Sequence, residues 1–315
     1  MLGTPTLTSL LDQQTYILRT QLDAVYDGAV DAVHDARVAT RRTRELLALV
    51  PGVPGRDGED DTAKGYKKMG RALGQVRDID VRIALIQHLE EHTPQAGPSL
   101  LLVRRDLEGD RLRKARDLIK TLERIDVAAL LRAVADAHPG GLRRRLTANG
   151  WPRQLRRLLV ERAHGAVDAI GHATGIYFPR RAHGARIAIK QLRYAAEIAQ
   201  ATRLAEVQTA VRTLRKAQEI LGDLHDRQAL ADSLACYGKD DGVDPEHVQL
   251  ARQVLEGEVM QLHGQYLARR AGLRSACGEV ERNASQAWRP GPAVAAGAAL
   301  AVSGLLYHRR AAAGR

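Results

Sequence analysis

The sequence predicts an all-α protein, and three observations support this fold class. Residues that favour helices dominate, whereas only 11 of the 315 residues are Phe, Trp or Tyr. Apolar residues recur at helical spacing almost throughout the chain, and no segment shows the strict alternation of a strand. Breaks in the helical pattern fall where Gly and Pro cluster. A chain of 315 residues allows two modest domains or one duplicated domain.

Clusters of glycine and proline divide the chain into its helical segments. Glycine adds backbone freedom and proline lacks the N–H group that a helix interior needs, so both residues mark helix ends. The breaks lie at residues 51–58, 93–98, 138–141, 149–152 and 238–245. We expect helices between these positions.

An internal repeat indicates how these helices are organised. HDARVATRRTRELLALV from His34 aligns with HGARIAIKQLRYAAEIA from His183, 149 residues further on. Downstream, Lys64, Lys67, Lys68, Leu73, Gly74 and Asp78 align with Arg212, Arg215, Lys216, Leu221, Gly222 and Asp226. The repeat predicts two helical units, 8–140 and 150–285, and leaves residues 286–315 as a C-terminal tail outside it.

Basic residues form stripes on the repeated helices. Because a helix turns about 100° per residue, residues three or four positions apart share a face. The stripe of the first half comprises His34, Arg37, Arg41 and Arg44, and that of the second half comprises His183, Arg186, Lys190 and Arg193. The following helices carry Lys64, Lys67, Lys68 and Arg71 in one half and Arg212, Arg215 and Lys216 in the other. We add Arg42, although its counterpart is Gln191, and expect Tyr194 to pack in the interior.

The charge of the chain points to a negatively charged partner. The formal net charge is +11, and aromatic residues on which single-stranded nucleic acids stack are scarce. We expect no acidic i,i+4 partners inside the stripes, so that like charges face one another until an anion binds. Arginine forks and lysine ammonium groups both suit phosphate oxygens. A single basic stripe is usually a solvated helix face, but its repetition in both halves favours a binding function.

The motifs that carry these stripes resemble the CHAD domain family, which is named for its histidine-containing α-helical character. VHDARVATRRTR followed by LGQVRDIDV, and HGARIAIKQLRY followed by LGDLHDRQAL, resemble its two motif sets over roughly residues 8–280. The resemblance implies two four-helix bundles related by a pseudo-twofold axis, with a basic central channel that binds inorganic polyphosphate without catalysis. Its signature positions match His34, Arg37, Arg41, Arg44, His183, Arg186, Lys190 and Arg193.

Departures from the family pattern lie in the second half. Gly184 follows His183, Gln191 replaces a basic residue, and Glu219 stands opposite Arg71 of the first half. These differences predict weaker anion binding by the second half. The chain shows no strand-rich region of the triphosphate-tunnel type that often accompanies this module. We therefore expect no enzyme activity, no cofactor and no metal.

Three other functions remain as alternatives. Sequence-independent binding of nucleic acid needs only phosphate contacts from Lys and Arg. A histidine phosphotransfer domain would place one accessible His on a bundle face. Metal-dependent phosphohydrolysis is suggested by His34-Asp35 and His225-Asp226, but Gly184 replaces Asp35 in the repeat.

The cysteines and the tail bear on where the protein acts. Cys236 and Cys277 are too few for a disulfide framework, and no secretion signal is evident, so we expect a cytoplasmic protein. The polyphosphate binding that the family resemblance implies would associate it with polyphosphate granules. Residues 293–307 form an uncharged run of 15 residues. A bilayer span usually needs about 20 apolar residues, so we favour a docked or self-associating helix over membrane contact.

Overall fold

The computed structural model describes residues 6–49, 61–135, 150–237 and 242–286. This part of the chain contains nine α-helices, a short 3₁₀ helix (η1) and no strand, which confirms the all-α fold class. The elements of the first half are α1 (Leu7–Tyr26), α2 (Val30–Leu47), α3 (Asp61–His92), η1 (Pro94–Ala96), α4 (Gly97–Arg124) and α5 (Val127–Ala135). Those of the second half are α7 (Trp151–His172), α8 (Pro179–Ala201), α9 (Gln208–Tyr237) and α10 (Pro245–Ser285).

Helix boundaries follow the glycine and proline clusters where the structure describes them. The predicted break at 93–98 contains η1 and the first two residues of α4, and α7 begins within the predicted break at 149–152. Helix α10 begins at Pro245, and the carboxylate of Asp244 caps it by accepting a hydrogen bond from the backbone N–H of Glu246 at 2.8 Å. The predicted breaks at 51–58 and 138–141 lie outside the described residues, as does the tail segment 293–307.

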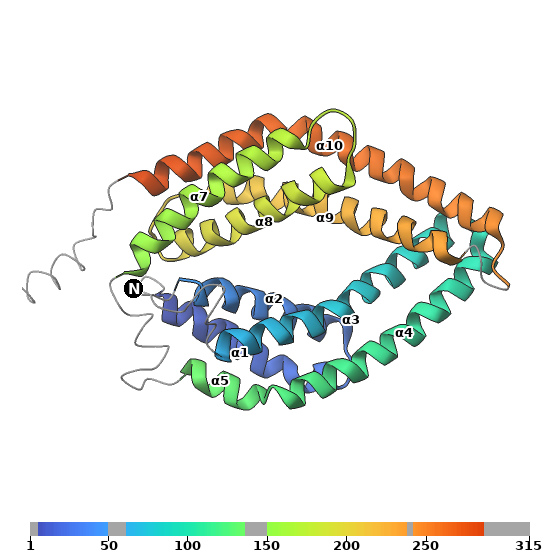
Figure 1. Ribbon diagram of the computed structural model, residues 1–315, viewed down its shortest axis with the longest axis horizontal. Coiled ribbons are helices and arrows are strands. Elements are labelled where there is room, and N and C mark those ends of the chain that lie inside the picture. The colour runs from blue at the N-terminus through green and yellow to red at the C-terminus, as the bar shows by residue number, and fades with distance from the viewer. Residues whose placement is uncertain (1–5, 50–60, 136–149, 238–241, 287–315) are drawn as a thin grey trace, which may run out of the picture. The chain divides into compact units, whose positions relative to one another are not determined.

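Consecutive helices pack against each other within each half. In the first half α1 packs on α2, α2 on α3, and α3 on α4, while α7 packs on α8 and α8 on α9 in the second. The two halves face each other in Figure 1, with contacts between α2 and α8 and between α3 and α9. All these helices belong to one compact unit, Met1–Ala284, except for the last residue of α10. The pseudo-twofold relation between the halves stays a prediction.

The main hydrophobic core joins both halves. Leu46 and Leu73 from α2 and α3 belong to the same buried cluster as Leu192 and Leu221 from α8 and α9. Removing apolar area from water stabilises a fold by roughly 25 cal/mol per Å², so this shared core favours the association of the halves. Leu46, Leu47 and Ala195, which lie on the two stripe-bearing helices, are buried in this core.

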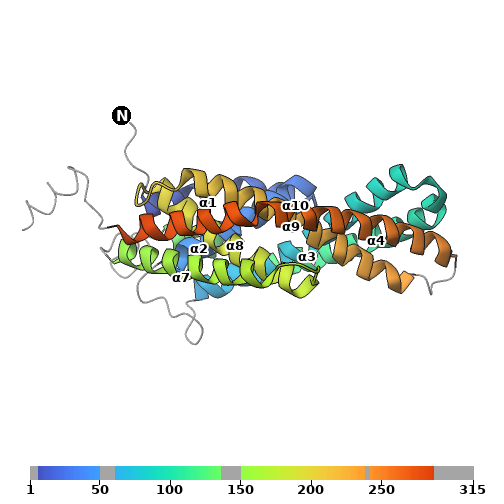
Figure 2. The same cartoon turned by 90° about the horizontal axis from the view of Figure 1, so that it is seen from above.

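A second hydrophobic cluster lies where the α3–α4 and α9–α10 hairpins meet. Its buried members include Ile86 and Leu100 from the first half and Leu234 and Leu255 from the second. Figures 1 and 2 show α4 and α10 beginning at the same end of the unit, beyond α2 and α8. The two halves are therefore held together at two separate places along α3 and α9.

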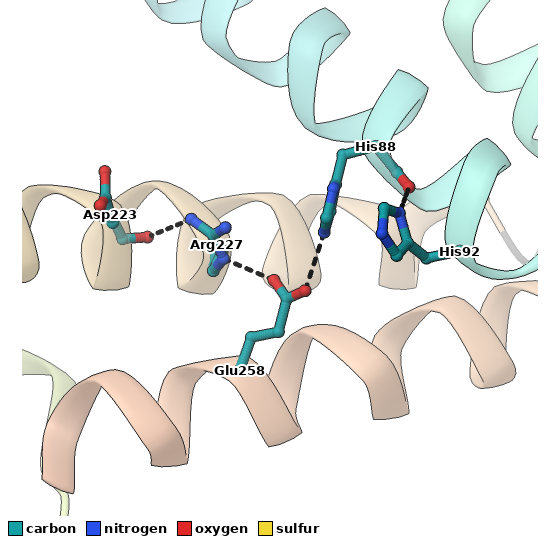
Figure 3. Close-up of polar contacts among 5 residues, drawn as sticks. All are labelled: His88, His92, Asp223, Arg227 and Glu258. Carbon is teal, nitrogen blue, oxygen red and sulfur yellow. Dashed lines mark hydrogen bonds and ion pairs between the residues drawn. The ribbon is translucent and has the colours of Figure 1, made fainter. Parts of the chain in front are cut away.

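A polar cluster near this second core links α3 to α9 and α10 (Figure 3). Glu258 of α10 accepts from Nε of Arg227 at 2.5 Å and contacts Nε2 of His88 at 2.9 Å. The ring of His92 stacks beside that of His88, with centroids 4.1 Å apart. Burial opposes ionisation of Glu258, but the hydrogen bonds from His88 and Arg227 outweigh it and lower the pKa of this carboxyl. Glu258 thus connects all three helices through its ionised form.

Candidate functional site

Two adjacent cavities lie where the repeated helices of the two halves meet. One, of about 420 Å³, is lined by residues of α2, α3, α8 and α9, and the other, of about 570 Å³, by residues of α2, α3, α7 and α8. Arg41 lines both cavities, and we call the two together the cation cleft. Its Lys and Arg residues are Arg37, Arg41, Arg44, Lys67, Arg77, Arg82, Arg162, Arg186 and Lys190. Only three carboxylates line it among the described residues: Glu45, Asp78 and Asp226.

The stripes of α2 and α8 converge in this cleft. Lys190 of α8 is partly buried, and its pKa is lowered to about 8 by burial and then by Arg186, Arg41 and Arg37. Two of those three arginines belong to α2, so cations from both halves act on one ammonium group. Burial also lowers the pKa of Arg41, and Arg193 and Arg37 lower it further. The cleft is therefore a site of excess positive charge.

Tyr194 holds Arg41 in place across the two halves. The guanidinium carbon of Arg41 lies 4.6 Å from the centroid of the Tyr194 ring, and that of Arg193 lies 4.5 Å from the same ring. Tyr194 is buried, as predicted, and its ring stabilises the cations beside it by a cation–π interaction. Arg41 is thereby held with most of its side chain shielded from water.

Three histidines lie close to the Lys and Arg residues of the cleft. His34 lines the cleft on α2, and the rings of His183 and His225, from α8 and α9, have centroids 4.9 Å apart. Burial and nearby arginines lower the pKa of His34 and His183, and they lower that of His225 to about 4. All three rings are therefore neutral near pH 7 in the free protein, and an anion in the cleft would favour their protonation.

Acidic residues enter the cleft from α3 and α9. Arg37 donates from Nη1 to Oδ1 of Asp78 at 3.0 Å, and Asp226 occupies the equivalent place in the repeat, near Arg186. Burial raises the pKa of Asp226, although Arg186 opposes this shift. Arg37 thus has a carboxylate partner, but Asp78 comes from the neighbouring helix and is not the i,i+4 partner that the sequence predicts to be absent.

The prediction that the stripes lack acidic i,i+4 partners is wrong at Arg193, which does not line the cleft. Arg193 is buried, pairs with Glu197 one turn further along α8, and donates to Oε1 of Gln218 at 2.9 Å. Its partner is the acidic i,i+4 residue that was expected to be absent. Arg193 is satisfied within the protein and takes no part in lining the cleft.

The remaining predicted residues divide between the cleft and the outer surface. Arg44 and Lys67 line the cleft, whereas Arg42 and Arg215 line a different pocket described below. The other side chains are exposed and line neither cavity of the cleft: Lys64, Lys68, Arg71, Arg212 and Lys216. Two of them have acidic neighbours, since Lys64 lies 3.5 Å from Asp61 and Lys216 lies 3.5 Å from Glu219.

Several residues of the cleft were missed by the stripe pattern. Arg77 and Arg82 follow the predicted lysines on α3, and Arg162 comes from α7. Arg162 also pairs with Glu45 of α2 at 2.8 Å. The repeat itself carries a signal for this part of the site, because Gly74 and Asp78 recur as Gly222 and Asp226. The guanidinium of Arg37 lies beside Gly74, where an added Cβ would make an ordinary contact of 3.8 Å with its Nε.

Metal-binding groups and membrane-spanning helices would bear on the alternative functions. Within the described ranges, no group of three or more His, Cys, Asp or Glu residues is placed to hold a metal ion. None of the helices in the same part of the chain combines the length and apolar character that crossing a bilayer requires.

The fold and the cleft define an all-helical protein whose two halves share a cation-lined site. The chain belongs to the CHAD domain family, since the sequence model of that domain matches residues 9–235. A search of curated proteins finds no match.

Solved structures give the same fold. The crystal structure of the CHAD domain from the plant Ricinus communis is similar with a TM-score of 0.60 and 19% identity, over 88% of this chain and 93% of that one. PptA from Streptomyces chartreusis is similar with a TM-score of 0.58 and 19% identity, over 86% of this chain and 97% of that one. At such identities the likeness defines the fold, and the function is argued from the residues.

Proposed function

We propose that the protein binds inorganic polyphosphate in the cation cleft and performs no chemistry on it. The observation that carries this proposal is the convergence of Arg37, Arg41, Arg186 and Lys190 from two repeated helices on one space. Nine Lys and Arg residues line the cleft against three carboxylates, a formal excess of six positive charges among the described lining residues. A linear chain of phosphates supplies many negative charges along one narrow path.

The burial of the cleft cations favours a thin polymer over duplex nucleic acid. Lys190 and Arg41 are partly buried. A thin flexible chain can reach them inside the cleft, whereas a rigid duplex would contact only the rim of the cleft. Duplex nucleic acid remains the second candidate, because phosphate contacts alone do not distinguish polyphosphate from the backbone of a nucleic acid. We further propose that the protein acts in the cytoplasm, where polyphosphate granules would be its target.

The histidines of the cleft fit a binding role better than phosphotransfer. Burial and then nearby arginines lower the pKa values of His34 and His225, and a phosphotransfer histidine would need space for the attacking and leaving groups of a donor protein. Transfer of labelled phosphate to either ring would favour the phosphotransfer function instead.

Calorimetric titration with polyphosphate and with duplex DNA of matched phosphate content tests the proposal. The variant with Arg37, Arg41, Arg186 and Lys190 all changed to Ala removes four cleft cations. A matched control removes four exposed cations outside the cleft: Lys68, Arg71, Arg212 and Lys216. We expect polyphosphate to bind the wild type more tightly than DNA, the cleft variant to lose at least about a hundredfold in affinity, and the control to lose far less. Equal losses in both variants would contradict a cleft site and indicate diffuse attraction.

A further inference from the structure

A second pocket lies beside the same contact of α2 with α8 but faces away from the cleft stripe. It has a volume of about 210 Å³ and is lined by residues of α1, α2, α8 and α9. Arg41 and Arg42 are consecutive on α2, so their side chains diverge by about 100° around the helix. Arg41 consequently lines the cation cleft, whereas Arg42 lines this pocket, which we call the amphipathic pocket.

Two buried polar atoms in the amphipathic pocket have no partner. Gln14 is 4% exposed and Tyr194 is 3% exposed, and both line the pocket. Among the described residues, neither Oε1 of Gln14 nor the hydroxyl of Tyr194 makes a hydrogen bond. A buried polar group without a hydrogen bond is unfavourable, so a ligand or water that reaches either atom would stabilise the fold.

The charges of the pocket favour an anion. Glu45 already pairs with Arg162 at 2.8 Å, and Glu197 pairs with Arg193 and with Arg215 at 3.1 Å. In contrast, Arg42 is exposed and has no ion pair with any described residue. The carboxylates are thus neutralised by the protein, and Arg42 is the cation left for a ligand.

Apart from the exposed amide of Gln13, the rest of the wall is apolar. Leu10, Leu46, Ile198 and Ala201 line the pocket between the polar groups. A phosphate polymer would leave these side chains without favourable contacts, whereas a hydrocarbon body would cover them. The volume is below the range of about 300–1,000 Å³ that is usual for drug-sized ligands, so the body must be short.

We propose that the amphipathic pocket binds a small monocarboxylate with a short aliphatic body. Its carboxylate would pair with Arg42, and its carbon chain would cover Leu10, Leu46 and Ile198. This inference does not depend on polyphosphate binding. The pocket nevertheless shares Tyr194 and Glu45 with the cation cleft, so an occupant would touch the ring that holds Arg41.

Binding of three six-carbon probes to the full chain tests the proposal. Hexanoate, 1-hexanol and hexylamine have the same aliphatic body and differ in the charge of the head group. We expect hexanoate to bind at least about tenfold more tightly than either of the others, measured by calorimetry and by saturation-transfer NMR. No detectable binding of hexanoate, or equal binding of the three probes, would overturn the proposal.

Variants then locate the site. Arg42→Gln should bring the affinity for hexanoate close to that for hexanol, because the exposed charge is removed without altering the core. Ala201→Trp should fill the pocket and abolish binding of all three probes. Arg44→Gln removes an equal charge from the neighbouring cleft and should leave hexanoate binding unchanged. If hexanoate binds Arg42→Gln as it binds the wild type, or if Arg44→Gln is the variant that loses binding, the pocket is not the site. Circular dichroism checks the fold of each variant.

Discussion

The guanidinium of Arg41 lies over the ring of Tyr194, 4.6 Å from its centroid, and so joins the cation stripe of one half to the core of the other. A cation–π contact of this kind contributes roughly 0.5–2 kcal/mol, depending on how far it is shielded from water. It fixes one cation at the centre of the cleft, where Lys190 and Arg186 of α8 face it. The site is therefore built from both halves at once.

Arg41 and Arg42 should differ sharply in their effect on polyphosphate binding. Arg41→Ala should weaken binding about tenfold or more, because a charged hydrogen-bond donor inside the cleft is lost. Arg42→Ala removes the same charge from the adjacent position but should change affinity less than about threefold, since only long-range attraction is lost. Calorimetry on the two variants makes this comparison. Similar losses would mean that net charge, and not the cleft, determines affinity.

Lys190→Met should make the free protein more stable while weakening its anion binding. The pKa of Lys190 is about 8 in the folded protein, against an ordinary value of 10.5. The unfolded chain therefore binds more protons between these values, and stability rises with pH through that window. After allowance for solvent screening, we expect a gain on the order of 1 kcal/mol at pH 7. Urea unfolding at pH 7 and pH 10 measures it, and the gain should shrink at pH 10. A variant less stable than the wild type at pH 7 would contradict this prediction.

Polyphosphate affinity should rise as pH falls below 8, in part through His225. Its pKa is about 4 in the free protein, and a bound phosphate raises it, so binding takes up protons in the range above 4. The affinity gain between pH 8 and pH 5 should therefore be smaller in His225→Gln than in the wild type. His164→Gln on α7, outside the cleft, serves as control and should keep the full gain. Because the polymer itself also titrates, the difference between variants is the quantity to compare.

Affinity should depend steeply on salt, and the cleft cations should set the slope. Each phosphate neutralised on a flexible single chain contributes about 0.7 to the slope of log K against log salt concentration. Changing Arg37, Arg41, Arg186 and Lys190 to Ala should reduce that slope by about 3. Titrations at several sodium chloride concentrations give the value. An unchanged slope would show that these four side chains do not contact the polymer.

Glu258 should stabilise the contact between the hairpins in a pH-dependent way. Its pKa is lowered in the folded protein, so its contribution is present above the ordinary value of 4.5 and is lost as pH falls through the folded value. Glu258→Gln should destabilise the protein by about 1–3 kcal/mol at pH 7, because Arg227 and His88 lose their charged partner. Glu256→Gln, whose partner Arg252 lies one turn away at 3.4 Å, should have little effect. Denaturant unfolding at pH 7 and pH 4 compares the two, and equal effects would argue against a special role for Glu258.

Much of the fold could be predicted from periodicity and repetition. The glycine and proline clusters located the starts of α4, α7 and α10, because helix ends depend on local backbone chemistry. The placement of Arg37, Arg41, Arg186 and Lys190 on shared helix faces followed from helical spacing alone. What spacing could not give is the distance between the two faces, which the shared core of α2 and α8 determines.

The residues that the sequence pattern misplaced depend on tertiary contacts. Asp78 lies on a different helix from Arg37, and Arg162 reaches the cleft from α7, so no pattern within one helix contains either contact. Arg193 continues the stripe on the same face, but it lies two turns beyond Arg186, where contacts with Gln218 of α9 and Glu197 take the place of the cleft. Lys68 and Arg71 share a face with each other and not with the cleft. Charge periodicity identifies a face, and packing decides where that face points.

The second hydrophobic cluster has a consequence for any attempt to divide the chain. Ile86 and Leu100 of the first half share a buried cluster with Leu234 and Leu255 of the second half. A fragment ending before α7 would therefore expose the apolar surface of α3 and α4 to solvent. Such a fragment should aggregate when expressed alone, yet it should be rescued by its complement supplied as a separate polypeptide. The duplicated modules have in this sense become obligate partners, and cutting between them would yield a complementation pair rather than two working proteins.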